Sequence, residues 1–317
     1  MNELTTTRHN PQIDPSMTVW GWEIPVYLFL GGLVAGMMII SGYFLFKGRN
    51  SEKTCSCFFL PLFSIVLLSL GIGALFLDLE HKLYVWRLYT TFKISSPMSW
   101  GAWILVLVYP ALIANILLRP SKILVDKIPF LNSWAEKINQ KQMWIKNIGV
   151  VNMLLGGMLG IYTGVLLSSM GSRPLWNSAI LPILFLVSGL SAAAAFVHMI
   201  AKNVEERELL AKSDNGFLVI EIFVIALLLI GLLSSSLVHI QAAQLLISGV
   251  FAPVFWVFVV GMGIVIPLII QLLAVNHKIK HTPVVPIMVI IGGLILRFII
   301  VNAGQYSHYM NAHFNDF

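Results

Sequence analysis

The sequence predicts an all-α integral membrane protein with eight transmembrane helices, arranged as two four-helix bundles with both termini extracytoplasmic. Of its 317 residues, 58% are hydrophobic and 11% are charged, and the mean hydropathy is +0.86. A soluble domain carries about 25% charged residues, so these values exclude a soluble globular protein. The apolar residues also gather in long runs, and about 20 of them in succession suffice for a helix that crosses the bilayer.

Eight such runs are bounded by charged residues, proline or glycine. Segments 222–233 and 284–296 are apolar on every face, whereas the strands of a membrane β-barrel alternate in polarity, so helices are predicted throughout. The predicted helices cover residues 22–46, 57–77, 99–118, 147–170, 178–200, 216–239, 249–275 and 284–302.

The connections between the helices differ in charge, and this difference predicts the orientation. The loops after the first, third, fifth and seventh helices carry fourteen Lys and Arg residues. The opposite side carries only five, namely Arg8, Lys82, Arg87, Lys93 and Arg173. Cytoplasmic loops are enriched in Lys and Arg, so both termini are predicted to lie outside the cytoplasm.

The chain divides into a polar tail over 1–19, a first bundle over 20–170, a second bundle over 171–305 and a C-terminal tail over 306–317. A weak internal repeat supports the two halves, because Trp20 and Gly32 at the start of the first helix recur as Trp176 and Gly189 before and within the fifth. A chance match is the alternative, because the alignment needs two gaps. The repeat aligns Glu23 with Ala179, so only the first half keeps an acid at that position.

Three acids lie at or within the predicted helices. Glu23 opens the first helix and Asp78 ends the second, both near the outer surface, while Glu221 lies within the sixth. An ionisable group at membrane depth costs about 2.5–3.5 kcal/mol on insertion, which makes each acid a functional candidate. Alternatively, Glu23 is an acid favoured by the helix dipole, and Glu221 is a boundary residue or one bonded within the protein.

The outer connection between the second and third helices is the loop richest in reactive side chains. Asp78 and His81 suit a reaction that releases protons at the membrane surface. Lys82, Trp86 and Arg87 are predicted to dock a partner, since positive residues on an outer loop run against the usual charge distribution. A solvated loop with an aromatic belt is the alternative.

A metal centre is not predicted. The two cysteines, Cys55 and Cys57, cannot form a four-ligand site alone, and His198 and His239 belong to opposite ends of their helices and cannot share a haem iron. Tyr162 lies in the outer half of the fourth helix beside glycines, where a phenol could bind the carbonyl of a ligand entering from the lipid. The alternative for Tyr162 is an interfacial belt residue.

Four ordered blocks of residues resemble the NrfD/PsrC family of polysulfide-reductase-type membrane subunits. They span residues 20 to 305, nearly the whole chain. The blocks are Trp22-Glu23-Ile24-Pro25 with Gly31-Gly32; Asp78-Leu79 with Trp86-Arg87 and Ser96-Pro97-Met98-Ser99-Trp100; Tyr162-Thr163-Gly164 with Pro174-Leu175-Trp176; and Leu296-Arg297 with Ala303-Gly304-Gln305. One departure is Tyr27, which stands where a histidine is expected from the best-known polysulfide-type member.

The resemblance implies a subunit of a respiratory oxidoreductase in the bacterial inner membrane. Such a subunit exchanges electrons between quinone, here favouring menaquinone, and a partner with [4Fe–4S] clusters. The terminal reaction then belongs to an extracytoplasmic molybdopterin or multihaem subunit. The resemblance also places the quinone pocket at the outer face of the first bundle.

At such a pocket, we expect Glu23, Asp78 and His81 to handle protons and Tyr162 and Tyr27 to bind the quinone together with Glu23 and His81. Two other functions remain open. Glu221 and Arg297 could serve a proton path or a secondary transporter, and the chain could be a passive anchor for an extracytoplasmic reductase.

Overall fold

The computed structural model contains helices and loops but no strand in the residues that it describes. These residues are 20–48, 59–118, 141–201, 203–275 and 282–307. The predicted N-terminal tail, most of the C-terminal tail, both cysteines and much of the inner loops lie outside the described residues. Within these residues, eight helices are long and apolar enough to cross a membrane, which confirms the predicted all-helical membrane protein with eight spans.

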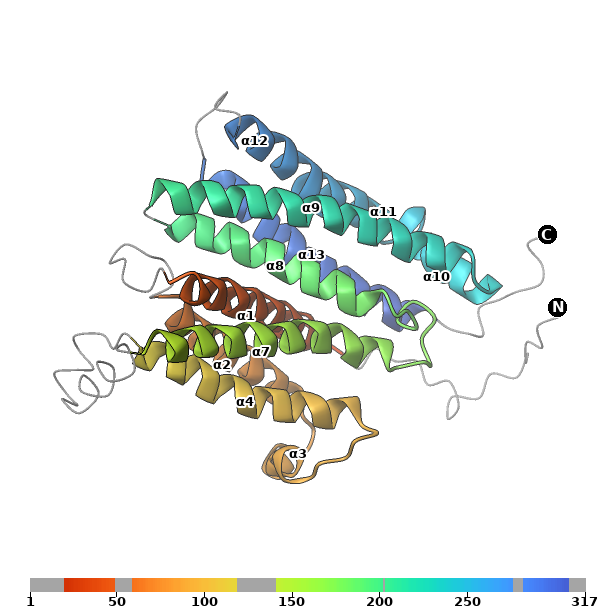
Figure 1. The fold of residues 1–317 in the computed structure, drawn as a ribbon. Helices are drawn as coiled ribbons and strands as arrows, with labels where there is room; N and C mark the ends of the chain where they lie inside the picture. The colour runs from red at the N-terminus through yellow and green to blue at the C-terminus, as the bar shows by residue number, and fades with distance from the viewer. Residues whose placement is uncertain (1–19, 49–58, 119–140, 202, 276–281, 308–317) are drawn as a thin grey trace.

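The spanning helices follow one another along the chain with the predicted spacing (Figure 1). Their bounds are α1 Glu23–Phe46, α2 Leu60–Asp78, α4 Pro97–Leu117, α7 Gln142–Ser168, α8 Leu181–Ile200, α9 Val204–Leu233, the segment Ala252–Val275 and α13 Val284–Tyr306. In the described connections, three shorter helices lie between them: η3 Lys82–Tyr84, α3 Trp86–Thr90 and α10 Leu237–Ile247.

Helix α9 begins twelve residues before the predicted start at 216. Asn203 caps it, since its side chain accepts a hydrogen bond from the Glu205 backbone N–H at 3.1 Å, and Glu205 and Glu206 lie in the first turn, where the helix dipole favours acids. The added turns are polar, so a search for apolar runs does not find them. Helix α9 also ends at Leu233, and the residues predicted to continue it to 239 begin the separate helix α10.

The seventh span is not a regular α-helix. After the short α11, Ala252–Val254, residues Phe255–Val265 form the π-helical stretch η4, and α12 then runs over Ile266–Val275. Gly263 in η4 packs directly on Gly292 of α13, where a Cβ added at Gly263 would lie 2.8 Å from the Gly292 Cα. Such irregular turns are rare and often occur at functional positions.

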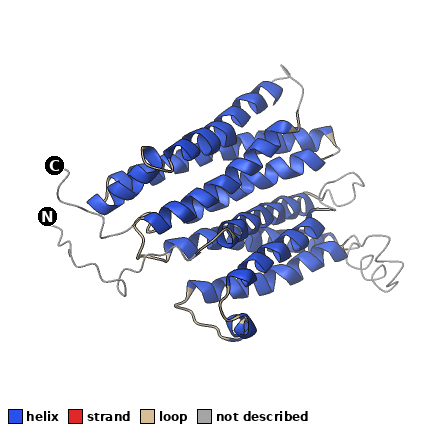
Figure 2. Ribbon diagram, turned by 180° about the vertical axis from the view of Figure 1, so that it is seen from behind, coloured by secondary structure: helices blue, strands red, loops and turns tan. Residues whose placement is uncertain are grey.

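The helices pack in two sets with the same cyclic order. In the first, α1 contacts α2 and α7, while α4 contacts α2 and α7. In the second, α8 contacts α9 and α13, while the seventh span contacts α9 and α13. Figures 1 and 2 show these sets one above the other, with α1, α7 and α8 along the contact between them.

Residues that the internal repeat aligns touch one another where α1 meets α8. Gly32 lies against Gly189, so a Cβ at Gly189 would stand 2.6 Å from the Gly32 carbonyl oxygen. Trp20 likewise stacks on its counterpart Trp176, with ring centroids 5.1 Å apart. When two copies of a duplicated unit are related by an approximate two-fold axis, equivalent residues near that axis contact each other, as these pairs do.

Candidate functional site: a cavity at one end of the first four spanning helices

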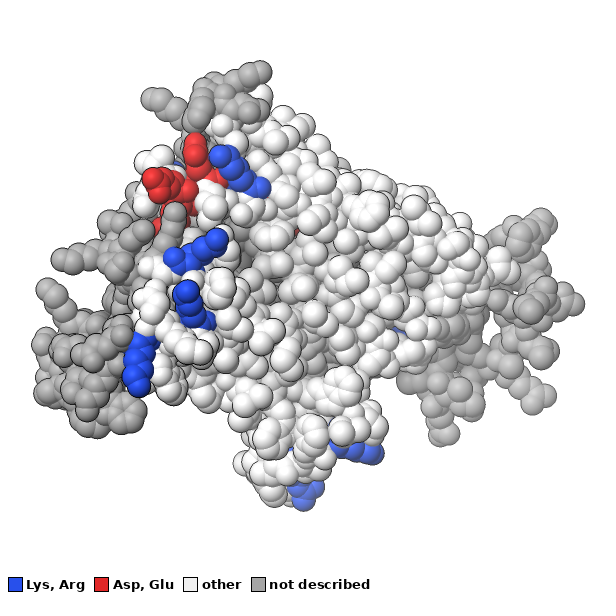
Figure 3. Space-filling model, in the orientation of Figure 1, with Lys and Arg blue, Asp and Glu red and all other residues white. Residues whose placement is uncertain are grey.

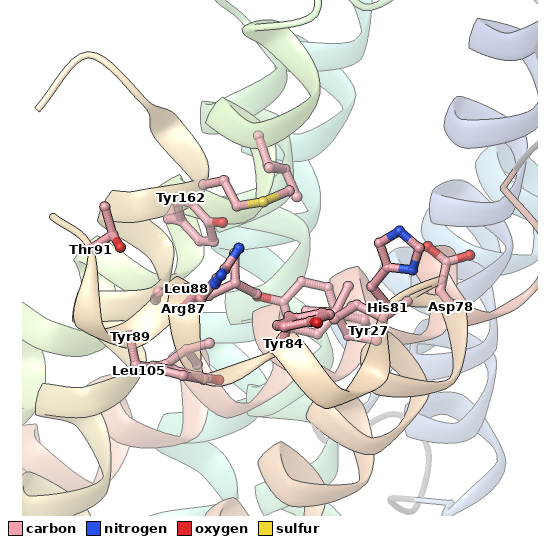
Figure 4. Close-up of a pocket in the computed structure, with 15 residues that line it drawn as sticks. Tyr27, Asp78, His81, Tyr84, Arg87, Leu88, Tyr89, Thr91, Leu105 and Tyr162 are labelled. Carbon is pink, nitrogen blue, oxygen red and sulfur yellow. The ribbon is translucent and has the colours of Figure 1, made fainter. Parts of the chain in front are cut away.

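A cavity of about 580 Å³ lies beside the halves of α1, α2, α4 and α7 that are nearest the connection containing η3 and α3, and this connection bounds it (Figure 4). Its walls are largely apolar, with leucines from α2, α4, α7 and the connection, and with Met98 and Ala102 from α4. Its polar groups come mainly from tyrosines and from the residues that follow α2. Pockets for small molecules have this size and this composition.

Five residues that the sequence singled out line this cavity. They are Tyr27, Asp78, His81, Arg87 and Tyr162, which come from α1, the end of α2, the connection, α3 and α7. Figure 4 shows Asp78 and His81 toward one side of the cavity and Tyr162 toward the other, with Arg87 between them. The fold therefore brings into one site groups that are up to 135 positions apart in the sequence, from Tyr27 to Tyr162.

The two predicted tyrosines are both buried, and Tyr162 packs closely on a glycine. Tyr162 is 6% exposed, and its phenol lies directly over Gly101 of α4, where an added Cβ would overlap the ring. Tyr27 is 1% exposed and packs near Gly71 of α2. Buried phenols need hydrogen-bond partners. A ligand with two carbonyl or hydroxyl oxygens would supply such partners in this cavity.

Asp78 and His81 lie where α2 ends. Leu79 leaves the helix with extended backbone, which turns the chain from the bilayer toward the connection. Asp78 is half-buried, while His81 is exposed and packs edge-on against Tyr84, with ring centroids 6.4 Å apart. A carboxylate and an imidazole three residues apart thus lie at the edge of the cavity, and the imidazole is exposed.

Glu23 does not line the cavity. It is half-buried in the first turn of α1, and its carboxylate folds back over Gly21, where any Cβ would collide with it. Glu23 still lies close enough to Asp78 for the two charges to repel each other. Glu23 therefore lies near Asp78, which lines the cavity, but does not line the cavity itself.

Sequence reasoning missed several lining residues in the connection. Tyr84, Tyr89 and Thr91 contribute three hydroxyl groups. Burial and the nearby phenol of Tyr109 raise the pKa of Tyr89, so this phenol keeps its proton across neutral pH and can donate a hydrogen bond. The sequence does not indicate the short helices η3 and α3, so the spacing of these residues could not show that they line one cavity.

The residues predicted to dock a partner separate into two environments. The Arg87 guanidinium lies over the rings of Tyr84 and Trp86, 4.8 and 5.7 Å from their centroids, and Arg87 also lines the cavity. Lys82 and Trp86 are exposed and do not line it. Docking of a partner by these residues stays a prediction.

A second polar group is buried between α8, α9 and α13, apart from the cavity. Arg297 is fully buried and donates to the Phe185 and Gly293 carbonyl oxygens, at 2.9 and 3.1 Å, and to the Ser188 hydroxyl. Glu221, 4% exposed, also hydrogen-bonds Ser188 and interacts with the Arg297 charge. The two residues predicted as a possible proton path therefore meet through one serine.

Asp214 extends this buried polar group toward the N-terminal end of α9, and sequence reasoning missed it. It is 1% exposed and accepts hydrogen bonds from the Ser191 hydroxyl and the Gln271 amide, each at 2.7 Å. Both donors are neutral. Asp214 lies two turns before Glu221 on α9. Its neighbours Lys212 and Ser213 are also polar, so this stretch resembles a polar loop in the sequence.

Within the described residues, no group of three or more His, Cys, Asp or Glu side chains could hold a metal ion. His198 lies in the last turn of α8 and His239 in α10, so they stand toward opposite ends of the spanning helices. His239 instead pairs through Nδ1 with the Ser236 hydroxyl at 2.8 Å.

Comparison with known proteins places the chain in a family. The family model described as "Polysulphide reductase, NrfD" matches residues 6–307. The chain is 32% identical to a component of the polysulfide reductase of Wolinella succinogenes over 302 residues, which cover 90% of this chain and 94% of the relative. It is 30% identical to an NrfD homologue of Haemophilus influenzae, in a match that covers 94% of this chain and 97% of the relative. It is 24% identical to a component of the selenate reductase of Mesobacillus selenatarsenatis, in a match that covers 90% of this chain and 74% of the relative. The chain therefore belongs to the NrfD family of polysulfide reductase membrane subunits.

Proposed function

We propose that this chain is the quinone-reactive subunit of a respiratory oxidoreductase and that quinol is oxidised, or quinone reduced, in the cavity beside Tyr27 and Tyr162. The observation that carries the proposal is the cavity itself, which joins apolar walls to phenols on one side and to Asp78 and His81 on the other. Its relatives belong to reductases that act on polysulfide and selenate, by their names. A multi-subunit reductase needs a membrane component that reacts with a membrane-soluble electron carrier.

A quinol ring has two hydroxyl oxygens and loses two electrons and two protons. Tyr162 and Tyr27 would bind the ring oxygens and hold the ring, since packing on Gly101 fixes the Tyr162 phenol and burial holds Tyr27. Asp78 and His81 would accept the protons and pass them to water at the outer face. Glu23, beside Asp78, would favour proton uptake by that acid because two nearby carboxylates resist being charged together.

The proposed topology is two four-helix bundles in the bacterial inner membrane, with both termini extracytoplasmic and the cavity in the first bundle. The repeated cyclic order of helix contacts supports the two bundles. Figure 3 supports the orientation, because on the face that it shows one group of Lys and Arg side chains lies at the end of the helices away from the cavity. The residues of the two bundles would be 20–170 and 171–305.

The proposed partners follow from the outer position of the cavity. Electrons would pass to or from a ferredoxin-like [4Fe–4S] subunit at the outer face and then to an extracytoplasmic molybdopterin or multihaem subunit. Menaquinone is the proposed quinone. In this arrangement the chain itself holds no metal and supplies binding groups and proton acceptors.

Mutation of the acids tests this proposal in the assembled complex. Asp78→Asn and Glu23→Gln should each lower the menaquinol-dependent reduction of the terminal acceptor while the subunits still assemble. Glu80→Gln is the matched control, since Glu80 is an exposed neighbour that does not line the cavity. Full activity in both acid variants would overturn the roles given to the acids. If no substitution of a residue that lines the cavity lowered the activity, a passive anchor would be favoured.

A proton path through the second set of helices is the second candidate function. The observation that favours it is the buried series from Asp214 through Glu221 and Ser188 to Arg297, which leads from the inner end of α9 toward α1. Arg297 reaches α1, since a Cβ at Gly32 would lie 3.4 Å from its guanidinium. Glu221→Gln should then abolish any proton uptake that accompanies turnover in proteoliposomes while electron transfer continues, and unchanged uptake would exclude this path.

A further inference from the structure

The connection between α2 and α4 lies beside the helices and not beyond their ends. Figures 1 and 2 both show α3 alongside the outer part of α4, to the side of the set that contains α1, α2 and α7. In Figure 3 the same region protrudes from the side of the molecule and carries Lys and Arg side chains. The flank of a membrane-spanning helix faces lipid, so this position is at the edge of the bilayer.

Side chains from α4 fix the connection in this place. The Ser99 hydroxyl accepts a hydrogen bond from the Lys93 backbone N–H at 3.0 Å and donates to the Thr91 carbonyl oxygen at 3.1 Å. The Trp100 indole N–H donates to the Ile94 carbonyl oxygen at 2.7 Å. Phe92 also packs edge-on against Trp103, with centroids 5.8 Å apart. The position beside α4 is therefore built by specific contacts.

The side chains of the connection lie in two environments. The residues of the connection that line the cavity are Tyr84, Arg87, Leu88, Tyr89 and Thr91. Other large apolar side chains of the connection are exposed: Leu83 at 88%, Ile94 at 73%, Phe92 at 56% and Trp86 at 55%. Some side chains of the connection thus cover the cavity, and others present apolar groups to the surroundings.

Water is a poor environment for these exposed apolar groups. Four large hydrophobic side chains, each more than half exposed, lie within twelve residues, and exposed apolar patches of this kind mark contacts with protein or membrane. The cations Lys82, Arg87 and Lys93 are interspersed among them. Apolar groups that enter the acyl region beside cations that reach the headgroups are the pattern of an interfacial membrane segment.

We propose that residues 82–94, here called the interfacial segment, bind the outer leaflet through Leu83, Trp86, Phe92 and Ile94, and bind anionic phospholipid headgroups through Lys82 and Lys93. Arg87, whose guanidinium lies over Tyr84 and Trp86, joins the lipid-facing side of the segment to the side that lines the cavity. The bound leaflet holds the lipid-side wall of the cavity in place. Attraction to lipid phosphate also explains why positive residues occur on an outer connection.

The sequence alone predicts that Lys82, Trp86 and Arg87 dock a protein partner. The place of the segment along the flank of α4 favours lipid, because a water-soluble partner approaches from beyond the helix ends. The two occupants differ in one measurable respect. A lipid-bound segment is surrounded by acyl chains with or without partner subunits, whereas a docking segment meets water until the partner arrives.

Spin labels can distinguish these environments in the full-length chain reconstituted in phosphatidylglycerol-containing nanodiscs. Cys55 and Cys57 are first replaced by serine, and single cysteines are then introduced as Leu83→Cys or Ile94→Cys. Leu70→Cys on the exposed, spanning part of α2 serves as the lipid reference, and Glu80→Cys serves as the water reference. Collision rates with oxygen, which partitions into lipid, and with a water-soluble nickel chelate are measured at each position.

Labels at 83 and 94 should resemble the label at 70, with at least a several-fold preference for oxygen over the nickel chelate relative to position 80. This preference should be the same in the isolated chain and in the assembled complex. Labels that resemble position 80 in the isolated chain and lose access to both reagents on assembly would overturn the proposal and establish protein docking. Labels that resemble position 80 in both states would also overturn it.

A second measurement tests the headgroup contact separately. In the variant Lys82→Gln/Lys93→Gln, the label at 83 should become more accessible to the nickel chelate in phosphatidylglycerol nanodiscs. In nanodiscs of phosphatidylcholine alone, the same substitutions should have no effect. Equal behaviour in the two lipids would contradict binding of anionic headgroups. Quinol turnover is not the readout, so these results are independent of the proposed function.

Discussion

Replacing Gly101 with alanine should displace the phenol of Tyr162 and slow quinol turnover without unfolding the protein. The added Cβ would overlap the Tyr162 ring at Cζ and Oη. Because this end of the side chain can move, we expect a stability cost near the low end of the about 1–3 kcal/mol typical of overpacking. The phenol must nevertheless shift by more than about 1 Å to regain van der Waals contact.

A displacement of this size has a large effect if Tyr162 positions the quinol. A misplacement of about 1 Å in a reacting site can cost about 100-fold in rate. This corresponds to about 2.7 kcal/mol of lost transition-state stabilisation. We therefore expect kcat/KM for menaquinol to fall about 100-fold, measured as quinol-dependent reduction of the terminal acceptor by the assembled complex in membranes.

Gly157→Ala is the matched control for this experiment. Gly157 lies on α7, the same helix as Tyr162, and an added Cβ there meets no atom within 4 Å. The double variant Gly101→Ala/Tyr162→Leu supplies a second control, since without the phenol the alanine should cause no further loss beyond Tyr162→Leu alone. Full activity of Gly101→Ala, or equal losses in Gly101→Ala and Gly157→Ala, would refute the role given to Tyr162.

Three further outcomes are expected. Gly189→Ala should lower the Tm strongly, because the added Cβ would lie 2.6 Å from the Gly32 carbonyl oxygen, and a helix backbone cannot move aside as a side chain can. An unchanged Tm would show that α1 and α8 are not closely packed. Arg297→Met should destabilise the fold by about 3–5 kcal/mol, because Glu221 loses the buried cation that it faces; a thermal-shift assay in detergent measures this loss. Tyr89→Phe should raise KM for quinol about 2- to 10-fold through one lost hydrogen bond of about 0.5–1.5 kcal/mol. The raised pKa keeps the Tyr89 phenol protonated, so the shape of the pH profile across neutral pH should not change.

Hydropathy predicts the spanning helices well because each crosses the same thickness of hydrocarbon. It fails where a helix continues past the membrane, as α9 does from Val204, since polar residues on a capped helix resemble a loop. It also fails to detect the π-helical stretch that starts at Phe255, because composition does not distinguish backbone hydrogen-bonding patterns. The internal repeat pairs Gly32 with Gly189 in sequence, but only the three-dimensional structure shows that the two residues touch.

The candidate site was partly predictable for a related reason. Asp78 and Tyr162 stand out in sequence because ionisable and phenolic groups are rare in apolar helices. Tyr89 does not, since aromatic residues are common in loops at the membrane surface. Asp214 escaped detection because its charge lies among other polar residues, and only the helix geometry shows that its side chain turns inward toward Ser191.

Photolabelling with an azido-menaquinone tests most directly whether quinone occupies the cavity. After illumination of the assembled complex, labelled peptides are identified by mass spectrometry, with excess unmodified menaquinone as competitor. We predict competed labelling of peptides that contain Tyr27, Tyr162 or residues 84–91 and reduced labelling in Gly101→Ala. Competed labelling confined to α9 or α13, beside Glu221 and Arg297, would contradict a quinone site in the cavity.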